Sequence, residues 1–226
     1  MKIVDKLRFK IIDMNKTILA IETSSSICSV SLFKNGENIG ILENDADRKH
    51  AEVLPSYVVS LLENNQLKIK NIDAIAVSIG PGSFTGLRVG LSFAKGLAYA
   101  IKCPIIPVPT ILAMAYSLRF KKPLNGIIRS HGEKIFFQEF IWDKKVPSVK
   151  DKPVLGNIHN YLDKVIGGFH FNCEEFLISA GNIYSAKPSA KDIAKLANIF
   201  FQKWHVPKPY DLTSEYMYPY VIKPND

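Results

Sequence analysis

A strand-to-helix junction that is rich in glycine constrains this chain more than any other stretch. The apolar run 72–79 has the β-prone character of a buried strand, and a proline and a glycine at 81–82 interrupt the chain directly after it. Ser83 or Thr85 can then cap a helix over 83–101, because its side-chain oxygen can accept a hydrogen bond from a first-turn N–H group. No lysine stands where a Walker-type phosphate loop requires one, so the junction is not a P-loop.

Within the expected helix, every fourth residue is small: Gly86, Gly90, Ala94 and Ala98. Glycine in a helix interior costs about 1 kcal/mol relative to alanine, so two glycines on one face need a compensating contact. We therefore expect another backbone to approach this stripe closely, and we interpret the stripe as a packing surface.

The composition is that of an ordinary globular chain. Its 226 residues, 47% of them hydrophobic, can form one large domain or two small ones. Cys28, Cys103 and Cys173 lie far apart, which argues against a disulfide framework or a zinc site, so each is expected to be a small buried hydrophobe in a reducing compartment. Charged residues interrupt every apolar run before it reaches the about 20 residues of a membrane helix. We expect a cytoplasmic protein that contacts no membrane.

Residues 1–16 differ from the rest in their charge, with five basic and two acidic side chains. Met14 stands just before the first convincing strand and is a candidate natural start, so we expect 1–16 to be an extension with little structural role. The alternative is a basic arm that binds RNA. The net charge of +8 is compatible with RNA association, but it is spread along the chain and does not decide between the two.

The first half of the chain predicts a strand meander and then a helix. Runs 17–23, 28–33 and 37–44 predict three strands, with an Asn-Gly pair as a tight hairpin between the last two. A helix is expected over 47–66. Its apolar face repeats at helical spacing, at Leu54, Tyr57, Val58, Leu61 and Leu62.

Downstream of the glycine-rich helix, strand and helix alternate again. A strand at 105–108 and a helix at 110–120 continue the pattern typical of parallel strands with helical crossovers, so we predict an α/β fold. A soft boundary near 107–109 divides the chain into an N-terminal subdomain, 17–109, and a C-terminal subdomain, 110–226.

The C-terminal half predicts two strands, a loop and a helix. The strands are expected at 124–130 and 134–142, and the Lys- and Pro-rich stretch 143–153 is expected to be a surface loop. Ser189 is expected to cap the helix, with Asp192 three residues on. The buried face of this helix is expected at Ile193, Leu196, Ala197 and Phe200.

Three motifs stand in a fixed order along the chain. They are Ile-Leu-Ala-Ile-Glu-Thr-Ser at 18–24, His-Ala-Glu-Val-Leu-Pro at 50–55 and Gly-Pro-Gly-Ser-Phe-Thr-Gly-Leu-Arg at 80–88. Together they resemble the TsaB (YeaZ) family of bacterial tRNA threonylcarbamoyladenosine biosynthesis proteins. The third motif is highly specific, whereas the first is shared across the actin, Hsp70 and sugar-kinase superfamily. The resemblance covers about 17–117 and fades afterwards.

The resemblance implies a fold of two tandem ribonuclease-H-like subdomains of that superfamily. The region after Gly167-Gly168 is short, so the second subdomain is expected to be reduced. Two stretches depart from the family pattern. Relatives usually carry an Asp-Ala-Arg type sequence where this chain has Arg-Ser-His at 129–131, and a Tyr-Leu-Arg where it has Tyr-Met-Tyr at 216–218.

The resemblance also implies a role without chemistry or cofactor. TsaB pairs with its paralogue TsaD, which transfers a threonylcarbamoyl group to N6 of adenosine 37 in tRNA, and the small ATPase TsaE assists in the same complex. We therefore expect a non-catalytic activator that forms a heterodimer with TsaD, contacts tRNA indirectly through the complex, and can self-associate when isolated.

Two other functions are weighed against this one. The first is an ATP-binding catalytic paralogue like TsaD, which binds a metal through a His-x-x-x-His pair. The corresponding stretch 107–115 has no histidine, which leaves nothing there to hold a transition metal. The second is a tRNA-binding protein that acts alone.

Glu22 ends the first strand, where superfamily ATPases and ribonuclease-H-like nucleases place an acidic metal ligand. Because no second carboxylate accompanies it, we interpret Glu22 as a structural residue that hydrogen-bonds the following turn. No Ser, His and Asp set stands out, which argues against a protease.

The resemblance places the partner interface on the two helices at 47–66 and 83–101. Some of its residues also have structural explanations: Glu52 suits the helix dipole, Ser83 suits a cap, and Arg88 is expected in an intrachain ion pair in preference to an interface contact. A leucine at Gly90 is then expected to block pairing while the chain stays folded. The expected interface positions are His50, Glu52, Leu54, Ser83, Phe84, Gly86, Arg88, Gly90 and Ala94.

Overall fold

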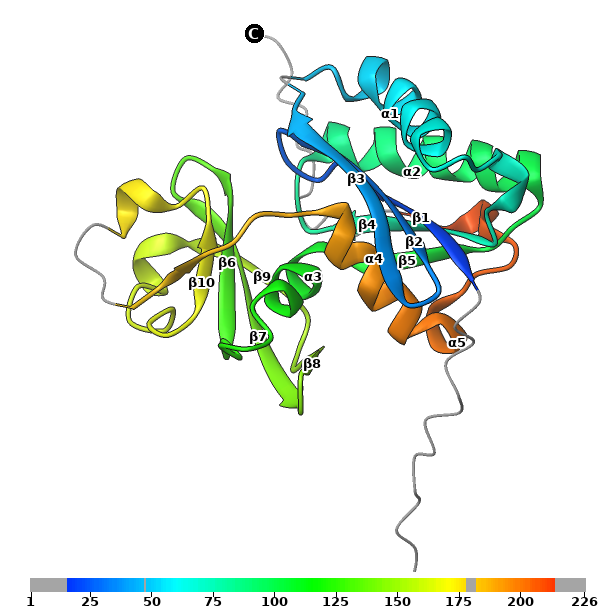
Figure 1. The fold of residues 1–226 in the computed structure, drawn as a ribbon. Coiled ribbons are helices and arrows are strands. Elements are labelled where there is room, and N and C mark those ends of the chain that lie inside the picture. The colour runs from blue at the N-terminus through cyan, green and yellow to red at the C-terminus, as the bar shows by residue number, and fades with distance from the viewer. Residues whose placement is uncertain (1–15, 47, 178–181, 214–226) are drawn as a thin grey trace, which may run out of the picture.

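The computed structural model describes residues 16–46, 48–177 and 182–213, which form two lobes, each built around a β-sheet (Figure 1). The expected extension, apart from Lys16, and the 216–218 departure lie outside the described residues. The first sheet has the strand order β3-β2-β1-β4-β5. The elements of the first lobe are β1 (Thr17–Glu22), β2 (Ile27–Lys34), β3 (Glu37–Asp45), α1 (His50–Asn64), a 3₁₀ turn (Ile69–Asn71), β4 (Ala74–Gly80), α2 (Phe84–Ile101) and β5 (Ile105–Pro109).

The strand directions confirm the predicted topology of the first lobe. β1 pairs with β2 and β2 with β3 in antiparallel fashion, so the meander is correct. β4 lies parallel to β1 and β5 lies parallel to β4, as the strand and helix alternation predicted. The register sets Ile21 of β1 opposite Val77 of β4, which brings the carboxyl ends of both strands to one edge of the sheet.

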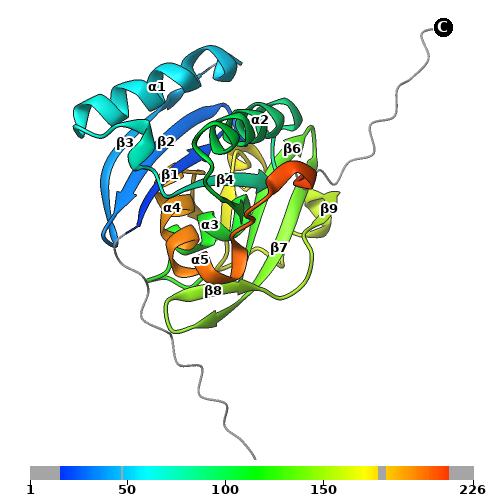
Figure 2. The same cartoon turned by 90° about the vertical axis from the view of Figure 1, so that its right-hand side faces the viewer.

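Both faces of this sheet are covered by helices. α1 and α2 lie side by side on one face (Figures 1 and 2). The predicted apolar residues of α1 are buried there at Leu54, Val58, Leu61 and Leu62, with Tyr57 half-buried. Every residue of β1 is buried, as expected for a central strand between two helical layers.

The small residues of α2 face the chain's own sheet. Gly86, Gly90, Ala94 and Ala98 are all buried. A Cβ atom added at Gly86 would collide with the carbonyl oxygen of Thr23, and one added at Gly90 would collide with the Thr23 hydroxyl. The Thr23 hydroxyl donates a hydrogen bond to the Gly86 carbonyl oxygen at 2.8 Å. The expected close backbone approach is therefore made within the chain, and the expectation that the stripe itself faces a partner is wrong.

The last helices return to the first lobe. α4 (Ala190–Ile199) packs on the sheet face opposite α1 and α2, and α5 (Phe201–Trp204) follows it (Figure 1). Val206 forms an antiparallel bridge with Ile105. The 107–109 boundary separates the two sheets, but the assignment of all of 110–226 to a second unit needs correction, because the apolar face of α4 is buried against the first sheet.

The helix prediction near the C-terminus is correct in position and wrong in one detail. Ile193, Leu196 and Ala197 are buried, and Phe200 packs partly buried at the end of α4. Ser189 occupies the cap position, but its side chain makes no capping hydrogen bond. The α4 N-terminus is instead bound by Ser29 of β2, whose hydroxyl oxygen accepts a hydrogen bond from the Ala190 N–H at 3.0 Å.

The second lobe holds a six-stranded sheet in the order β11-β10-β6-β7-β8, with β9 also paired to β7. The stretch 143–153 is not all loop, because β8 forms a hairpin with β7 across a turn in which Lys144 adopts a φ of 54°. The lobe's elements are α3 (Thr110–Ser117), β6 (Asn125–His131), β7 (Lys134–Asp143), β8 (Val146–Val149), β9 (Val154–Asn157), β10 (Phe169–Phe171), β11 (Tyr184–Ser185) and 3₁₀ turns at Ile158–Asn160 and Glu174–Phe176, and a further 3₁₀ turn lies at Pro209–Asp211.

The three cysteines are free and buried, as expected. Burial raises the pKa of the Cys28 and Cys103 thiols to about 11 and that of Cys173 to about 12. Thiols held this far from ionisation behave as apolar side chains. Over the part of the chain that the structure describes, no helix combines the length and hydropathy that a membrane crossing requires.

Gly90→Leu is expected to destabilise the isolated chain, because the new side chain would have to displace Thr23 from the face of α2. The expected loss of unfolding free energy is about 3 kcal/mol, the upper end of the usual cost of overpacking a core. Chemical denaturation followed by circular dichroism measures it.

The matched control is Gly96→Ala on the exposed side of the same helix, where no atom lies within 4 Å of an added Cβ. The unfolding free energy of that control should rise by up to about 1 kcal/mol, because alanine favours a helix more than glycine does. Equal stability of Gly90→Leu and the parent would contradict the packing described above.

Candidate functional site

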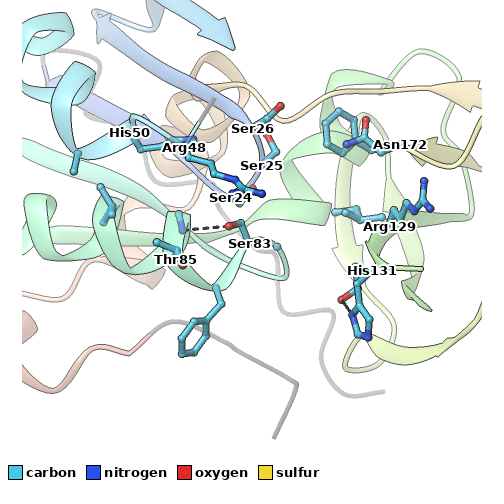
Figure 3. Close-up of a pocket in the computed structure, with 18 residues that line it drawn as sticks. Ser24, Ser25, Ser26, Arg48, His50, Ser83, Thr85, Arg129, His131 and Asn172 are labelled. Atoms are coloured by element: carbon cyan, nitrogen blue, oxygen red, sulfur yellow. Dashed lines mark hydrogen bonds between the residues drawn. The ribbon is translucent and has the colours of Figure 1, made fainter. Parts of the chain in front are cut away.

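A pocket of about 860 Å³ lies between the two lobes (Figure 3). The first lobe contributes the turn after β1, the start of α1 and the N-terminus of α2, and the second lobe contributes the ends of β6 and β10. Four of the expected partner residues line it, namely His50, Ser83, Phe84 and Gly86. The sequence did not indicate Arg48, and it marked 129–131 only as a departure from the family pattern, because the packing of the lobes is what brings 129–131 to the first lobe.

The glycine-rich turn is held against the turn that follows β1. Ser83 is the N-cap of α2, and its hydroxyl accepts a hydrogen bond from the Gly86 N–H at 3.2 Å. The Ser83 N–H donates to the Ser24 carbonyl oxygen at 2.6 Å. Thr85 lies inside the helix, so of the two predicted caps Ser83 is the one that acts. These bonds fix the N-terminus of α2 at the mouth of the pocket, where a helix favours negative charge.

The positive charges around the pocket point in different directions. The Arg48 side chain extends toward Ser24 and Ser83 (Figure 3). Arg129 is engaged elsewhere, because its guanidinium lies 2.8 Å from a Glu175 carboxylate oxygen and donates to the Gly132 carbonyl oxygen at 3.1 Å. His50 is buried, with Nε2 at 3.3 Å from the Ile27 carbonyl oxygen. The first-lobe side of the pocket is therefore the side that suits an anion.

Glu22 lies beneath the pocket in a fully buried position. Its Oε1 accepts a hydrogen bond from the Ser24 N–H at 2.5 Å, which confirms the predicted contact with the turn. Burial raises the pKa of this carboxyl from 4.5 to about 7, although interactions with Ser24 and Ser78 favour the charged form. Within the described ranges, no group of three or more His, Cys, Asp or Glu residues is placed to hold a metal ion.

The expected partner residues divide into an inner and an outer set. Leu54, Gly90 and Ala94 are buried on the inner sides of the two helices, and His50 and Gly86 are buried where they line the pocket. The outer set is exposed or half-buried, and its members are Glu52, Ser83, Phe84 and Arg88.

Arg88 makes a different contact from the one expected. Its guanidinium carbon lies 3.5 Å from the centroid of the Phe84 ring, one helical turn earlier. Among the described residues Arg88 forms no ion pair, so the expected intrachain ion pair is replaced by a cation–π contact.

The exposed side of α1 and α2 carries residues that the sequence interpretation missed. Val59 of α1 is 53% exposed and Tyr99 of α2 is 72% exposed. Gly96 lies one turn before Tyr99 and faces open space. We call Val59, Ser92, Gly96 and Tyr99 the outer α1–α2 face. The sequence does contain an indication of this face, because Gly96 is a third glycine in α2 and does not belong to the inward-facing stripe.

The two sheets define the class of this protein. An antiparallel meander extended by parallel strands is the arrangement of a ribonuclease-H-like subdomain, and two such units in tandem form the actin-like superfamily fold. Two solved YeaZ-type structures from Pseudomonas aeruginosa share it. One, described as an uncharacterized protein with similarity to peptidase YEAZ, has a TM-score of 0.77 and 21% identity, and the match covers 88% of this chain and 98% of that one. The other, described as YeaZ, has a TM-score of 0.74, with the same identity and coverage.

Sequence comparisons give the family. A family model described as TsaD, tRNA N6-adenosine threonylcarbamoyltransferase, matches residues 22–135. The tRNA threonylcarbamoyladenosine biosynthesis protein TsaB of Buchnera aphidicola is 30% identical over 164 residues, which are 68% of this chain and 71% of that protein. The TsaB of Haemophilus influenzae is 35% identical over 133 residues, which are 58% of this chain. The chain belongs to the TsaB (YeaZ) family.

The chain also resembles the transferase itself. The tRNA N6-adenosine threonylcarbamoyltransferase of Staphylococcus epidermidis is 32% identical over 185 residues, or 70% of this chain. The aligned parts span only 54% of that transferase and 56% of the Haemophilus TsaB.

Glu22→Gln is expected to remove a pH dependence of folding. The folded-state pKa of about 7 lies above the ordinary 4.5, so the folded chain keeps this proton longer than the unfolded chain does. Stability contributed by the protonated carboxyl is therefore lost as pH rises from about 4.5 to about 7. The amide does not ionise, so its contribution is not lost. The unfolding free energy of the variant should therefore rise by about 3 kcal/mol relative to that of the parent between about pH 5 and about pH 8.

Denaturation curves of parent and variant at those two pH values provide the measurement. Glu52→Gln removes the same charge from an exposed position in the first turn of α1 and controls for the change in net charge. If Glu22→Gln and Glu52→Gln change the pH dependence equally, the buried carboxyl is not its source.

Proposed function

We propose that this chain is a non-catalytic partner of TsaD in the formation of N6-threonylcarbamoyladenosine at position 37 of tRNA. Membership in the TsaB family and the functions that its relatives are named for support this assignment. The likeness to the transferase over 70% of this chain supports a pairing of two similar folds, in which corresponding helices of each protein face one another. TsaE completes the proposed complex, in which TsaD carries out the transfer to tRNA.

The observation that carries the proposal is the outer α1–α2 face. Gly96 lies in the middle of α2 on the side that faces away from the sheet. A glycine at such a position lowers helix stability by about 1 kcal/mol relative to alanine. The inward glycines of α2 have a reason within the chain, namely Thr23, but no atom lies within 4 Å of a Cβ added at Gly96. In this proposal the backbone of a second protein approaches Gly96, which explains why a glycine is present there. The exposed Val59 and Tyr99 provide apolar area for that protein to bury.

The state of Glu22 supports a role without chemistry. The carboxyl is sealed beneath the turn, hydrogen-bonded to Ser24, and has a pKa near neutrality. A carboxylate that serves as a metal ligand or base has to reach its target ionised, and burial opposes that here. In this proposal the chain acts by binding the active state of TsaD more tightly than the inactive one, because only such a difference in affinity can activate.

Gly96→Leu is expected to abolish or strongly weaken pairing with TsaD while the chain stays folded. The leucine points away from the sheet, so it leaves the core intact, but it occupies the space that the partner helix needs. Extra methylenes forced into a packed contact cost about 1–3 kcal/mol, which corresponds to a dissociation constant about 5- to 160-fold higher. Co-expression with TsaD and co-purification, followed by titration calorimetry, measures this.

The matched variant is Gly96→Ala, which adds a single methyl group and should weaken pairing less than Gly96→Leu, because it places a smaller volume in the same contact. Tyr99→Ala provides a second variant, which should weaken pairing by the loss of an exposed aromatic anchor. Recovery of TsaD by Gly96→Leu at the level of the parent would reject the outer α1–α2 face as the interface.

A further inference from the structure

A second surface, on the other side of the first sheet from α1 and α2, is both basic and aromatic. It forms where the loop after α3 meets the turn between β7 and β8 and the exposed side of α4, and α3 contacts both α4 and β8 there (Figure 2). Two large apolar side chains are exposed in it, Phe120 at 69% and Leu124 at 66%. We call its cations the basic patch, and they are Arg119, Lys121, Lys122, Lys144, Lys145, Lys191 and Lys195.

The contacts in this surface hold cations against two aromatic rings, the exposed Phe120 and the half-buried Tyr184. The Lys145 ammonium lies 4.6 Å from the Phe120 ring centroid, and the Arg119 guanidinium carbon lies 5.0 Å from the same centroid. The Lys121 ammonium lies 5.8 Å from the Tyr184 centroid. The Trp142 indole N–H donates to the Pro123 carbonyl oxygen at 2.8 Å, which fixes the end of β7 to the loop after α3. Segments distant in sequence are thus joined into one surface.

The charges of the basic patch are poorly neutralised by the chain itself. Burial, followed by the nearby Arg119 and Lys191, lowers the pKa of Lys195. One carboxyl in the area, Asp192, is buried beneath these cations, and burial raises its pKa to about 6, while a second, Asp143, is exposed at the end of β7. Among the described residues no member of the patch forms an ion pair. A polyanion relieves this mutual repulsion when it binds.

The chemistry of the surface favours RNA over an anionic membrane. Membrane attachment needs extensive buried apolar area, whereas the exposed Phe120 and Leu124 of this surface stand amid cations. Single-stranded RNA is bound by cations that follow the phosphates and by aromatic rings on which unpaired bases stack. We infer that the basic patch binds the RNA backbone directly and that Phe120 stacks against an unpaired base. The identification of that RNA as tRNA rests on the proposed function, but the preference for a polyanion does not.

A charge-matched pair of triple variants tests this inference. Lys121→Gln, Lys145→Gln and Lys191→Gln are combined in one chain, and Lys68→Gln, Lys70→Gln and Lys134→Gln, all exposed and outside the surface, in another. Each full-length chain, without TsaD, is titrated into a fluorescently labelled unmodified tRNA transcript across a salt series, and anisotropy is read. The patch triple should bind about tenfold or more weakly, and the slope of log affinity against log salt should fall by about 2 in magnitude, because each lost phosphate contact removes about 0.7–0.9. The control triple should retain the parent slope.

Phe120→Ala separates stacking from charge. It should weaken tRNA binding about fivefold or more with an unchanged salt slope, whereas Leu124→Ala should have little effect, because an aromatic ring and not an aliphatic chain stacks on a base. Equal losses in the two lysine triples, or an unchanged affinity in Phe120→Ala, would overturn the assignment.

Two further measurements decide what else the surface could bind. Tighter binding of the parent chain to phosphatidylglycerol vesicles than to tRNA, lost in the patch triple, would make it a membrane surface and overturn the inference. Co-purification of the patch triple with TsaD at the parent level supports the inference, and loss of TsaD overturns it by placing the patch in the protein interface. Because the tRNA titration contains no TsaD, its failure is distinct from a failure of the pairing tested with Gly96→Leu.

Discussion

The contact between the small face of α2 and Thr23 holds the first lobe and its site together. Because Gly86 and Gly90 have no side chains, α2 can lie directly on the residue that follows β1, and the Thr23 hydroxyl bonds the helix backbone. This contact sets Ser83 against Ser24 and presents the α2 N-terminus to the space between the lobes. The buried Glu22 carboxyl, bonded to the same turn, depends on it as well.

Small residues serve two different purposes on the two sides of α2. On the inner side they allow close packing within the chain. The contact with Thr23 compensates for the side-chain contacts that the glycines lack. On the outer side Gly96 has no such neighbour, and in the proposed pairing a contact with the partner accounts for its cost to the helix. In the proposed complex, glycine thus contributes to stability at position 90 and to recognition at position 96.

The first sheet separates the proposed protein-binding surface from α4, which contributes to the proposed RNA-binding surface. Helix α4 covers the sheet face opposite α1 and α2, and its buried side joins the apolar core that runs through α3 into the second lobe. Its exposed side contributes Lys191 and Lys195 to the basic patch. A TsaD-type partner on the outer α1–α2 face and an RNA on the basic patch would thus occupy opposite sides of the first lobe, and neither would exclude the other.

Local sequence determined the elements of the first lobe and, in the second half of the chain, α3, β6, β7 and α4, whereas the short strands β8 to β11 were not predicted. Apolar alternation located the meander, helical spacing located α1 and the buried face of α4, and the turn chemistry around Ser83 located the start of α2, because each of these signals arises between residues close in the chain. The sequence also carried the family, through three short motifs. Which side of α2 faces inward was decided only by the tertiary structure, since Thr23 lies 63 positions before Gly86 and no local pattern links them. The same holds for the return of α4 to the first sheet and for the gathering of Phe120, Lys145 and Lys191, because contacts between distant segments depend on how the lobes pack and not on the propensity of any one segment.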